Sequence, residues 1–388
     1  MIKKWISKAI FLIVFIVGGC SNEKTDVYQQ LIEDSKAFLE SADLENALAK
    51  AEEAIQLNEK EPSAYAIRGF IKLTQNELNQ AKEDLSYAVS KIHEIDDEMD
   101  QYSVYVQMGN LMYFQENYEE SLNYYHKALT INAEVSDLYN TIGLVYAAQG
   151  DYEAAIKEYF KALELDDGNY YAYGNVGKAF LMLDDPQRAL NEINTAFNLY
   201  AKVPEFYVIK GKALIALERL EEAERVYLEA ISIWEDLADA YYDLGDIYLR
   251  QGDYLASIQK FSFAKDYGIV EGYLGMGYCY RNLEQYEDAI KALKEYQSRI
   301  EGVDLKALYE MGLCYFQLGN YQQAITIYEE YLAIEENTEI MLIMGYAYEQ
   351  LSEYDKAYDL FMRIIEMDPN HEEASKELAF IEENHLNE

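Results

Sequence analysis

The sequence predicts an all-α protein, a single solenoid of about ten helix-turn-helix repeats closed by a C-terminal capping helix. A glycine returns at one slot in nine of ten successive repeats, and the five from Gly109 to Gly245 follow one another every 34 residues. A small residue follows twelve positions after each slot, and another usually follows seven positions later. Only four of the 388 residues are proline, and none falls inside an expected helix. Recurrence of this kind is typical of stacked repeats.

The repeated slot and the small residue after it can be followed along nearly the whole chain. The slot is held by Ser35, Gly69, Gly109, Gly143, Gly177, Gly211, Gly245, Gly277, Gly312 and Gly345. The small residues twelve positions later are Ala47, Ala81, Ser121, Ala155, Ala189, Ala223, Ser257, Ala289, Ala324 and Ala357.

Each repeat reads as two amphipathic helices joined by a tight turn. Apolar and small residues in its first half fall at i, i+3, i+4 and i+7, which is one face of a helix, and the second half forms another such face. Short segments such as Gly150-Asp151-Tyr152 separate the halves, so the two helices must run antiparallel. Glycine and alanine let the backbones approach, and stacking of neighbouring repeats supplies the core that one repeat lacks.

This pattern is similar to the tetratricopeptide repeat, in which W-x2-L-G-x2-Y is followed by A-x3-F and a further alanine. Tyrosine replaces the first tryptophan at Tyr65, Tyr105, Tyr139, Tyr173, Tyr207, Tyr241 and Tyr273. The resemblance covers 28–371 and implies a right-handed superhelical solenoid. The ten repeats are expected at 28–61, 62–95, 102–135, 136–169, 170–203, 204–237, 238–269, 270–303, 305–337 and 338–371.

Three irregularities and one terminal segment carry information about shape. Six extra residues, Asp96 to Gln101, separate the second and third repeats and could either lengthen a helix or bend the array. The seventh and eighth slot glycines are only 32 residues apart, which should tighten the junction near Tyr267-Gly268. The last three repeats put large residues where the others have a second alanine, so packing there must differ. Residues 372–388 are expected to form the capping helix.

The first residues resemble a bacterial lipoprotein signal peptide. Three lysines precede the apolar run Ala9 to Val17, and Val17-Gly18-Gly19-Cys20 resembles the lipobox of such signals. The run is shorter than the about 20 residues that span a bilayer. We therefore expect a signal at 1–19, a lipidated Cys20 with a short linker over 20–27, and a chain anchored to the cell membrane on its extracytoplasmic side. An ordinary secretory signal or an uncleaved anchor is the alternative.

The charge balance limits the kinds of partner. With 71 acidic and 32 basic residues, the formal net charge is −39. Binding to nucleic acid depends on basic residues that release counterions, so nucleic acid is not expected. An anionic leaflet should also repel the chain, which leaves the lipid as the membrane contact. The charge could equally serve only to keep a long molecule soluble.

No group of residues has the spacing of a reaction centre, so we expect no catalytic residue, metal or cofactor. The four histidines are scattered over the repeats as His93, His126, His371 and His385. Cys279 and Cys314 hold equivalent places in adjacent repeats, where other repeats have small apolar residues. We therefore expect buried thiols and not a disulfide, since neighbouring helices lie about 8 to 10 Å apart.

What remains is surface for recognition. The resemblance implies that the first helices of the repeats line a concave wall that binds an extended peptide or a helix of another protein. By position, this wall is expected to include Phe70, Asn110, Tyr113, Asn140, Tyr171, Lys178, Lys212, Tyr242, Arg250, Tyr278, Arg281, Tyr309, Phe316 and Tyr346. Among these, Lys178, Lys212, Arg250 and Arg281 could form a basic strip for carboxylates, or could merely pair with Asp246 and Glu271.

The sequence therefore favours a membrane-anchored scaffold or adaptor for other proteins at the bacterial cell envelope, serving assembly, secretion or regulation of envelope complexes. A purely structural spacer of the envelope is the alternative. An enzyme or cofactor carrier is a further alternative that no constellation of polar residues supports.

Overall fold

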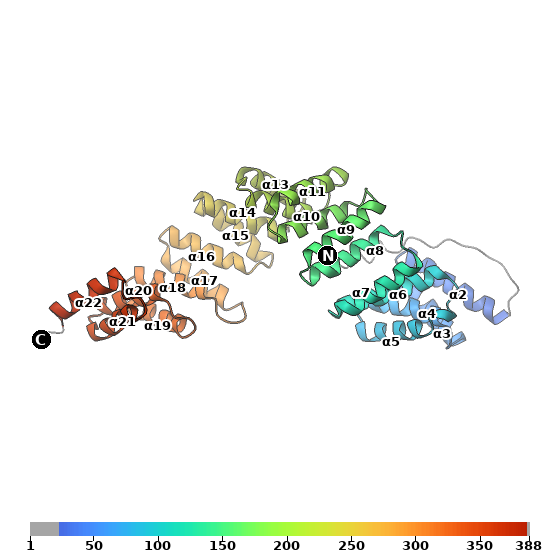
Figure 1. The fold of residues 1–388 in the computed structure, drawn as a ribbon, viewed down its shortest axis with the longest axis horizontal. Coiled ribbons are helices and arrows are strands. Elements are labelled where there is room, and N and C mark those ends of the chain that lie inside the picture. Colours follow the sequence, from blue (N-terminus) through green and yellow to red (C-terminus); the bar gives the residue numbers. More distant parts are fainter. Residues whose placement is uncertain (1–22, 386–388) are drawn as a thin grey trace. The chain divides into compact units, whose positions relative to one another are not determined.

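A computed structural model describes residues 23–385, and within that range the regular structure is entirely helical (Figure 1). The chain divides into two compact parts, which we call the N-terminal half (1–202) and the C-terminal half (203–388). The even repeat predicted one uninterrupted array, and nothing in its pattern marks this boundary. The expected signal peptide and the expected lipidation site, Cys20, lie outside the described residues.

Both halves are built from consecutive antiparallel helix pairs that stack in chain order. The helices of the N-terminal half are α2 (Glu23–Glu40), α3 (Leu44–Leu57), α4 (Pro62–Thr74), α5 (Leu78–Ser90), α6 (Glu98–Phe114), α7 (Tyr118–Ile131), α8 (Ser136–Ala148), α9 (Tyr152–Leu165), α10 (Tyr170–Met182) and α11 (Pro186–Leu199), with a 3-10 turn η1 (Ile92–Glu94) after α5. Those of the C-terminal half are α12 (Pro204–Ala216), α13 (Leu220–Ile233), α14 (Ala238–Gln251), α15 (Tyr254–Asp266), α16 (Glu271–Asn282), α17 (Tyr286–Gln297), α18 (Leu305–Gln317), α19 (Tyr321–Leu332), α20 (Thr338–Gln350), α21 (Tyr354–Met367) and α22 (Glu372–Asn384).

The turn inside every repeat uses the same backbone device. One residue adopts positive φ, and the next N–H donates back to a carbonyl five residues earlier, as Asp151 N does to Tyr146 O at 3.0 Å. Three of these positions are glycine, including Gly150 at φ 82°. The other seven are Ala42, Asn76, Glu116, Asp184, Glu218, Glu284 and Ser352. Because left-handed backbone costs a residue with a Cβ about 1 kcal/mol, the tight turn is maintained against local preference.

The slot glycines are the points of closest contact between the two helices of a repeat. Eight of the nine face the residue sixteen positions later, which has a large and fully buried side chain, whereas Gly177 lies nearest the carbonyl oxygen of Ala189. A Cβ on Gly143 would lie 2.4 Å from the ring of Tyr159, and a Cβ on Gly211 would lie 2.1 Å from the ring of Tyr227. Real side chains do not approach so closely, so the ring occupies the space that the missing Cβ leaves.

In the first repeat the sizes are exchanged: serine replaces glycine in the slot, and a small residue replaces the large one sixteen positions later. Ala51 stands sixteen positions after Ser35 and is the one small residue at that position among the ten repeats, and both residues are 0% exposed. The hydroxyl of Ser35 donates to the carbonyl of Ala47 at 2.6 Å. In the third repeat the serine stands on the second helix, and Ser121 donates to the carbonyl of Gly109 at 2.8 Å. All ten small residues twelve positions after the slot are 0% exposed.

The two changes of interval have distinct structural effects. The six extra residues lengthen a helix: α6 has 17 residues, whereas α4 and α8 have 13 each. The shorter interval brings α15 and α16 together, because a Cβ on Gly272 would lie 2.6 Å from the carbonyl oxygen of Phe261. Backbone therefore approaches backbone at this junction, next to Gly268 with φ 103°.

The end of the chain differs from the rest in its packing. Tyr296 and Tyr331 replace the second alanine, and both are buried. The hydroxyl of Tyr296 donates to Asp304 at 3.0 Å, in the segment that leads into α18. The last helix, α22, packs against α21 and buries Ala374 and Leu378. It thereby covers the apolar side of the last repeat.

A buried carboxyl group interrupts the apolar interior of the C-terminal half. Asp243 on α14 is 9% exposed, and the hydroxyl of Tyr227 on α13 donates to it at 2.6 Å. Burial raises the pKa of Asp243 to about 6, although the hydrogen bond from Tyr227 and the charge of Lys212 act in the opposite direction. The folded state therefore holds a proton on this carboxyl at pH values where the unfolded chain has released it.

We expect Gly109→Ala to lower the free energy of unfolding by about 1 to 2 kcal/mol, because its Cβ would lie 2.4 Å from the Tyr125 ring. Gly177→Ala is the matched control, since its nearest contact is 3.2 Å, to the carbonyl oxygen of Ala189. There the gain in helix propensity should offset the crowding. Urea unfolding followed by circular dichroism measures both. Equal losses would contradict the steric explanation.

We expect Asp243→Asn to change the pH dependence of stability. Because the folded pKa is raised from 3.8 to about 6, wild-type stability should fall as pH rises between these values and stay reduced above them. The asparagine variant should lose this dependence and be more stable than wild type at pH 8, by on the order of 2 kcal/mol. Glu330→Gln, on an exposed residue of α19, is the control. Identical pH profiles for the Asp243 variant and wild type would refute the assignment.

Candidate functional site

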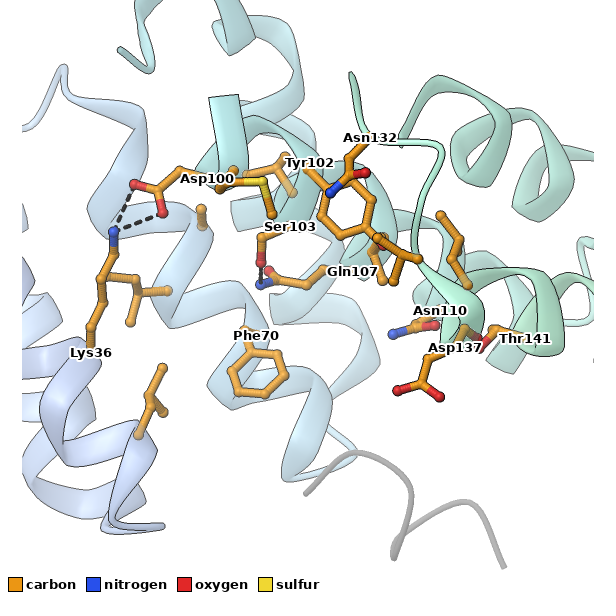
Figure 2. Close-up of a pocket in the computed structure, with 18 of the residues that line it drawn as sticks. Lys36, Phe70, Asp100, Tyr102, Ser103, Gln107, Asn110, Asn132, Asp137 and Thr141 are labelled. Atoms are coloured by element: carbon orange, nitrogen blue, oxygen red, sulfur yellow. Dashed lines mark hydrogen bonds and ion pairs between the residues drawn. The ribbon is translucent and has the colours of Figure 1, made fainter. Parts of the chain in front are cut away.

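The main candidate site is a hollow of about 460 Å³ in the N-terminal half, which we call the N-terminal hollow. Its walls come from α2, α4, α6 and α8, the first helices of the first four repeats, and from the segments before α6 and α8 (Figure 2). The second helices of these repeats lie behind this wall, because each pairs with the first helix of its own repeat. A row of first helices therefore builds the surface.

The lengthened α6 shapes one side of the hollow. Asp97 caps this helix by accepting hydrogen bonds from the N–H groups of Met99 and Asp100 at 2.7 and 3.2 Å. The added turn carries Asp100 to Lys36 on α2, whose ammonium contacts both carboxylate oxygens at 2.7 Å. Figure 2 shows this ion pair on one side of Phe70. The insertion thus links the first and third repeats directly.

The floor of the hollow is apolar. Ile67 on α4, Val104 on α6 and Leu138 on α8 line it and are almost fully buried. Phe70 and Tyr102 line it as well, and both are half-buried. Burial raises the pKa of Tyr102, and the nearby carboxylate of Asp137 raises it further. An apolar side chain of a partner could displace water from such a floor.

Polar groups stand above the floor. The Gln107 amide nitrogen donates to the hydroxyl of Ser103 at 2.9 Å, whereas its buried Oε1 has no hydrogen-bond partner within residues 23–385. Asn110 accepts a hydrogen bond from the hydroxyl of Tyr125 at 2.6 Å, and its amide group lies toward Asp137 and Thr141 in Figure 2. The hollow thus offers hydrogen-bonding groups beside apolar surface, a combination suited to peptide backbone.

Charge around the hollow is predominantly negative. Its acidic lining residues are Glu40, Asp100, Glu134, Asp137 and Asp166. Among the residues that the structure describes, Lys36 is the one basic residue that lines it. Lys36 is paired with Asp100, so this one basic side chain is already engaged by a carboxylate of the same hollow.

A second hollow, of about 400 Å³, lies in the C-terminal half between α16, α18 and the start of α20. Tyr278 and Tyr309 line it, and the Tyr309 hydroxyl donates to Glu339 at 2.9 Å. Glu310, at its base, is 8% exposed and forms an ion pair with Arg281. Burial raises the pKa of Glu310, whereas Arg281 acts to lower it. Two of the carboxylates that line this hollow are therefore engaged by side chains of the same chain.

The residues expected on the concave wall are divided between surface and interior. Phe70, Asn110, Tyr278 and Tyr309 line the two hollows. Asn140 is wrongly placed on the wall: it is 0% exposed and accepts a hydrogen bond from Asn175 at 2.9 Å. The others that are half-buried pack on neighbouring rings, namely Tyr113 on Tyr118, Tyr171 on Tyr170, Tyr242 on Phe261, Phe316 on Tyr321 and Tyr346 on Phe361.

The basic strip is not supported. Arg250 pairs with Asp246 one turn away at 2.8 Å, as the alternative interpretation proposed. Arg281 pairs with Glu310, and not with Glu271. Both arginines are thus committed to carboxylates of the same chain. Lys178 on α10 and Lys212 on α12 are exposed.

Other chemistry receives no support from the described residues. In residues 23–385 no group of histidine, cysteine and acidic side chains has a geometry that could hold a metal ion. Cys279 and Cys314 are both free and buried, and Cys279 donates to the hydroxyl of Ser257 at 3.1 Å. Within the same range, every helix is too short or too polar to cross a bilayer.

Parts of the chain match family models of known repeats. Models described as tetratricopeptide repeat match residues 100–167 and 315–379, and a model described as TPR repeat matches 211–252. The model of subunit 3 of the anaphase-promoting complex, or cyclosome, matches residues 271–331. No significant match was found among curated proteins.

Two solved structures resemble the chain, and the first of them supports the same fold. A tetratricopeptide repeat protein from Parabacteroides merdae is 20% identical, with a TM-score of 0.51 over 66% of this chain and 99% of that one. PilF of Pseudomonas aeruginosa is 17% identical, with a TM-score of 0.49 over 57% of this chain and 98% of that one. With the helix pairs, the slot glycines and the family matches in agreement, the chain is a tetratricopeptide-repeat protein.

Proposed function

We propose that the chain is a protein-interaction scaffold that is anchored to the cell membrane through Cys20 and binds its partners in the N-terminal hollow. Repeats of this fold form extended surfaces for other proteins, which is the role that the sequence resemblance implies. The proposal extends this role to the bacterial cell envelope, on its extracytoplasmic side.

The observation that carries the proposal is the N-terminal hollow itself. Its volume of about 460 Å³ lies within the about 300 to 1,000 Å³ typical of binding pockets. It combines an apolar floor with hydrogen-bonding groups and has no group arranged for catalysis. Binding of protein side chains fits these properties better than a chemical reaction does.

The position of the anchor supports the same site. In the sequence, two residues separate Cys20 from Glu23, where α2 begins. Lys36 and Glu40, farther along α2, line the hollow. The distance from the start of α2 to Lys36 is about 20 Å at 1.5 Å per residue. A lipid on Cys20 would therefore hold this hollow close to the membrane.

A photoreactive amino acid at position 141 tests the proposal in cells. Thr141 lines the hollow, and its hydroxyl bonds only to the carbonyl of Asp137 in its own helix. We expect crosslinks to a few discrete proteins from this position and none of the same proteins from Asn123, an exposed residue of α7 used as the control. The measurement is mass spectrometry of the crosslinked membrane fraction.

Membrane fractionation of the same cells tests whether Cys20 anchors the chain. The Cys20→Ala variant should leave the membrane fraction, because a chain of net charge −39 has little affinity for an anionic surface without a lipid. Crosslinks that are absent at position 141, or identical at position 123, would favour a structural spacer. A Cys20→Ala chain that remains membrane-bound would refute lipid anchoring.

A further inference from the structure

We propose that the N-terminal hollow selects an extended peptide segment with one large apolar side chain flanked by lysine or arginine. This inference rests on the proposed function, since it names the ligand of the same site. The charge of this partner is opposite to that of the carboxylates that the basic strip, one of two interpretations of the sequence, could have captured. Three observations support it: the charge of the rim, the apolar floor and the size of the hollow.

The charge of the rim determines the sign of the partner. Glu40 and Glu134 are exposed, and no described residue forms an ion pair with either side chain. Asp137 lines the same hollow and accepts a hydrogen bond from the amide of Asn169 at 3.4 Å. A cationic side chain would find several carboxylates within one site, whereas an acidic segment or a phosphate would be repelled by all of them.

The Lys36–Asp100 pair prevents the hollow from offering a cation of its own. Lys36 contacts both oxygens of Asp100, and the two side chains are 21% and 23% exposed. This partial shielding from water strengthens the pair relative to a fully solvated one. A partner carboxylate would have to compete with Asp100 for Lys36 while facing the other acids. The insertion that places Asp100 therefore also contributes to the choice of ligand.

The apolar floor determines what lies between the cations. Phe70, Ile67 and Leu138 line the hollow and are apolar, so a large apolar side chain of the partner would displace water there.

The size of the hollow favours an extended segment over a helix. A helix is about 10 to 12 Å across, so two turns occupy roughly 1,000 Å³. The hollow measures about 460 Å³. One side chain and the adjacent backbone fit within this volume, and the flanking cations would reach outward to Glu40 on α2 and Glu134 before α8.

The test uses the full chain and three short fluorescent peptides that share a central leucine and differ only in flanking lysine, glutamine or glutamate. Fluorescence anisotropy should give at least about tenfold tighter binding of the lysine peptide than of the glutamate peptide. This preference should shrink when salt rises from about 0.05 M to about 0.5 M. Phe70→Ala should weaken the lysine and glutamine peptides alike, because it removes the apolar contact that both share.

Charge-reversal variants test whether the preference for the lysine peptide arises at the N-terminal hollow. Glu40→Lys with Glu134→Lys should weaken the lysine peptide about tenfold and strengthen the glutamate peptide. Glu83→Lys with Glu164→Lys changes the net charge equally on exposed residues of α5 and α9 outside the hollow, and should have a much smaller effect. Circular dichroism melting checks that both variants fold.

Three results would overturn the inference: no charge preference among the peptides, equal effects of the two double variants, or no peptide binding at all. Equal effects would show that the −39 net charge of the chain attracts cations without a site. The proposed function is tested by a different result from the ligand class. If position 141 crosslinks discrete proteins while the peptides show no charge preference, the scaffold stands and only the ligand class is wrong.

Discussion

The structure depends on one steric constraint, the complementarity between a slot without a Cβ and a large side chain sixteen residues later. Tyr159 fits against Gly143 because the two helices can approach only where the first lacks a side chain. The first repeat obeys the same constraint with Ser35 and Ala51, both fully buried. Since neighbouring repeats stack on the surfaces that these pairs create, the course of the first helices, and with it the wall of the hollow, follows from this contact.

Much of the fold could be predicted from the sequence, because the repeat records a packing rule ten times. The helix pairs, their turns and the burial of Cys279 and Cys314 follow from residue size and helical period. The residues of the concave wall were harder to predict from the sequence, because neighbouring residues on a helix point about 100° apart. Asn140 was expected on the surface and is buried, whereas the next residue, Thr141, lines the hollow. A single helical step separates a correct assignment from a wrong one.

Side-chain contacts between different repeats could not be predicted from the sequence. Arg250 and Asp246 are one turn apart, so their pairing could be anticipated. Nothing in the sequence links Lys36 to Asp100, which lie in different repeats and meet because the insertion extends α6 by about a turn. The 40-residue interval was a signal that something differs there, but its effect on the hollow required the positions of four helices. The acidic character of the site emerged only with those positions.

The central claim is most directly tested by transplanting the first repeat's pair into the fourth, with Gly143→Ser, Tyr159→Ala and the double variant. In the double variant the serine hydroxyl can reach the carbonyl of Ala155, as Ser35 reaches Ala47 in the first repeat. The account predicts that the two changes compensate, with a coupling energy of about 1 to 3 kcal/mol in urea unfolding. Additive costs for the two single changes would contradict it, because they would show that slot and ring do not occupy the same space.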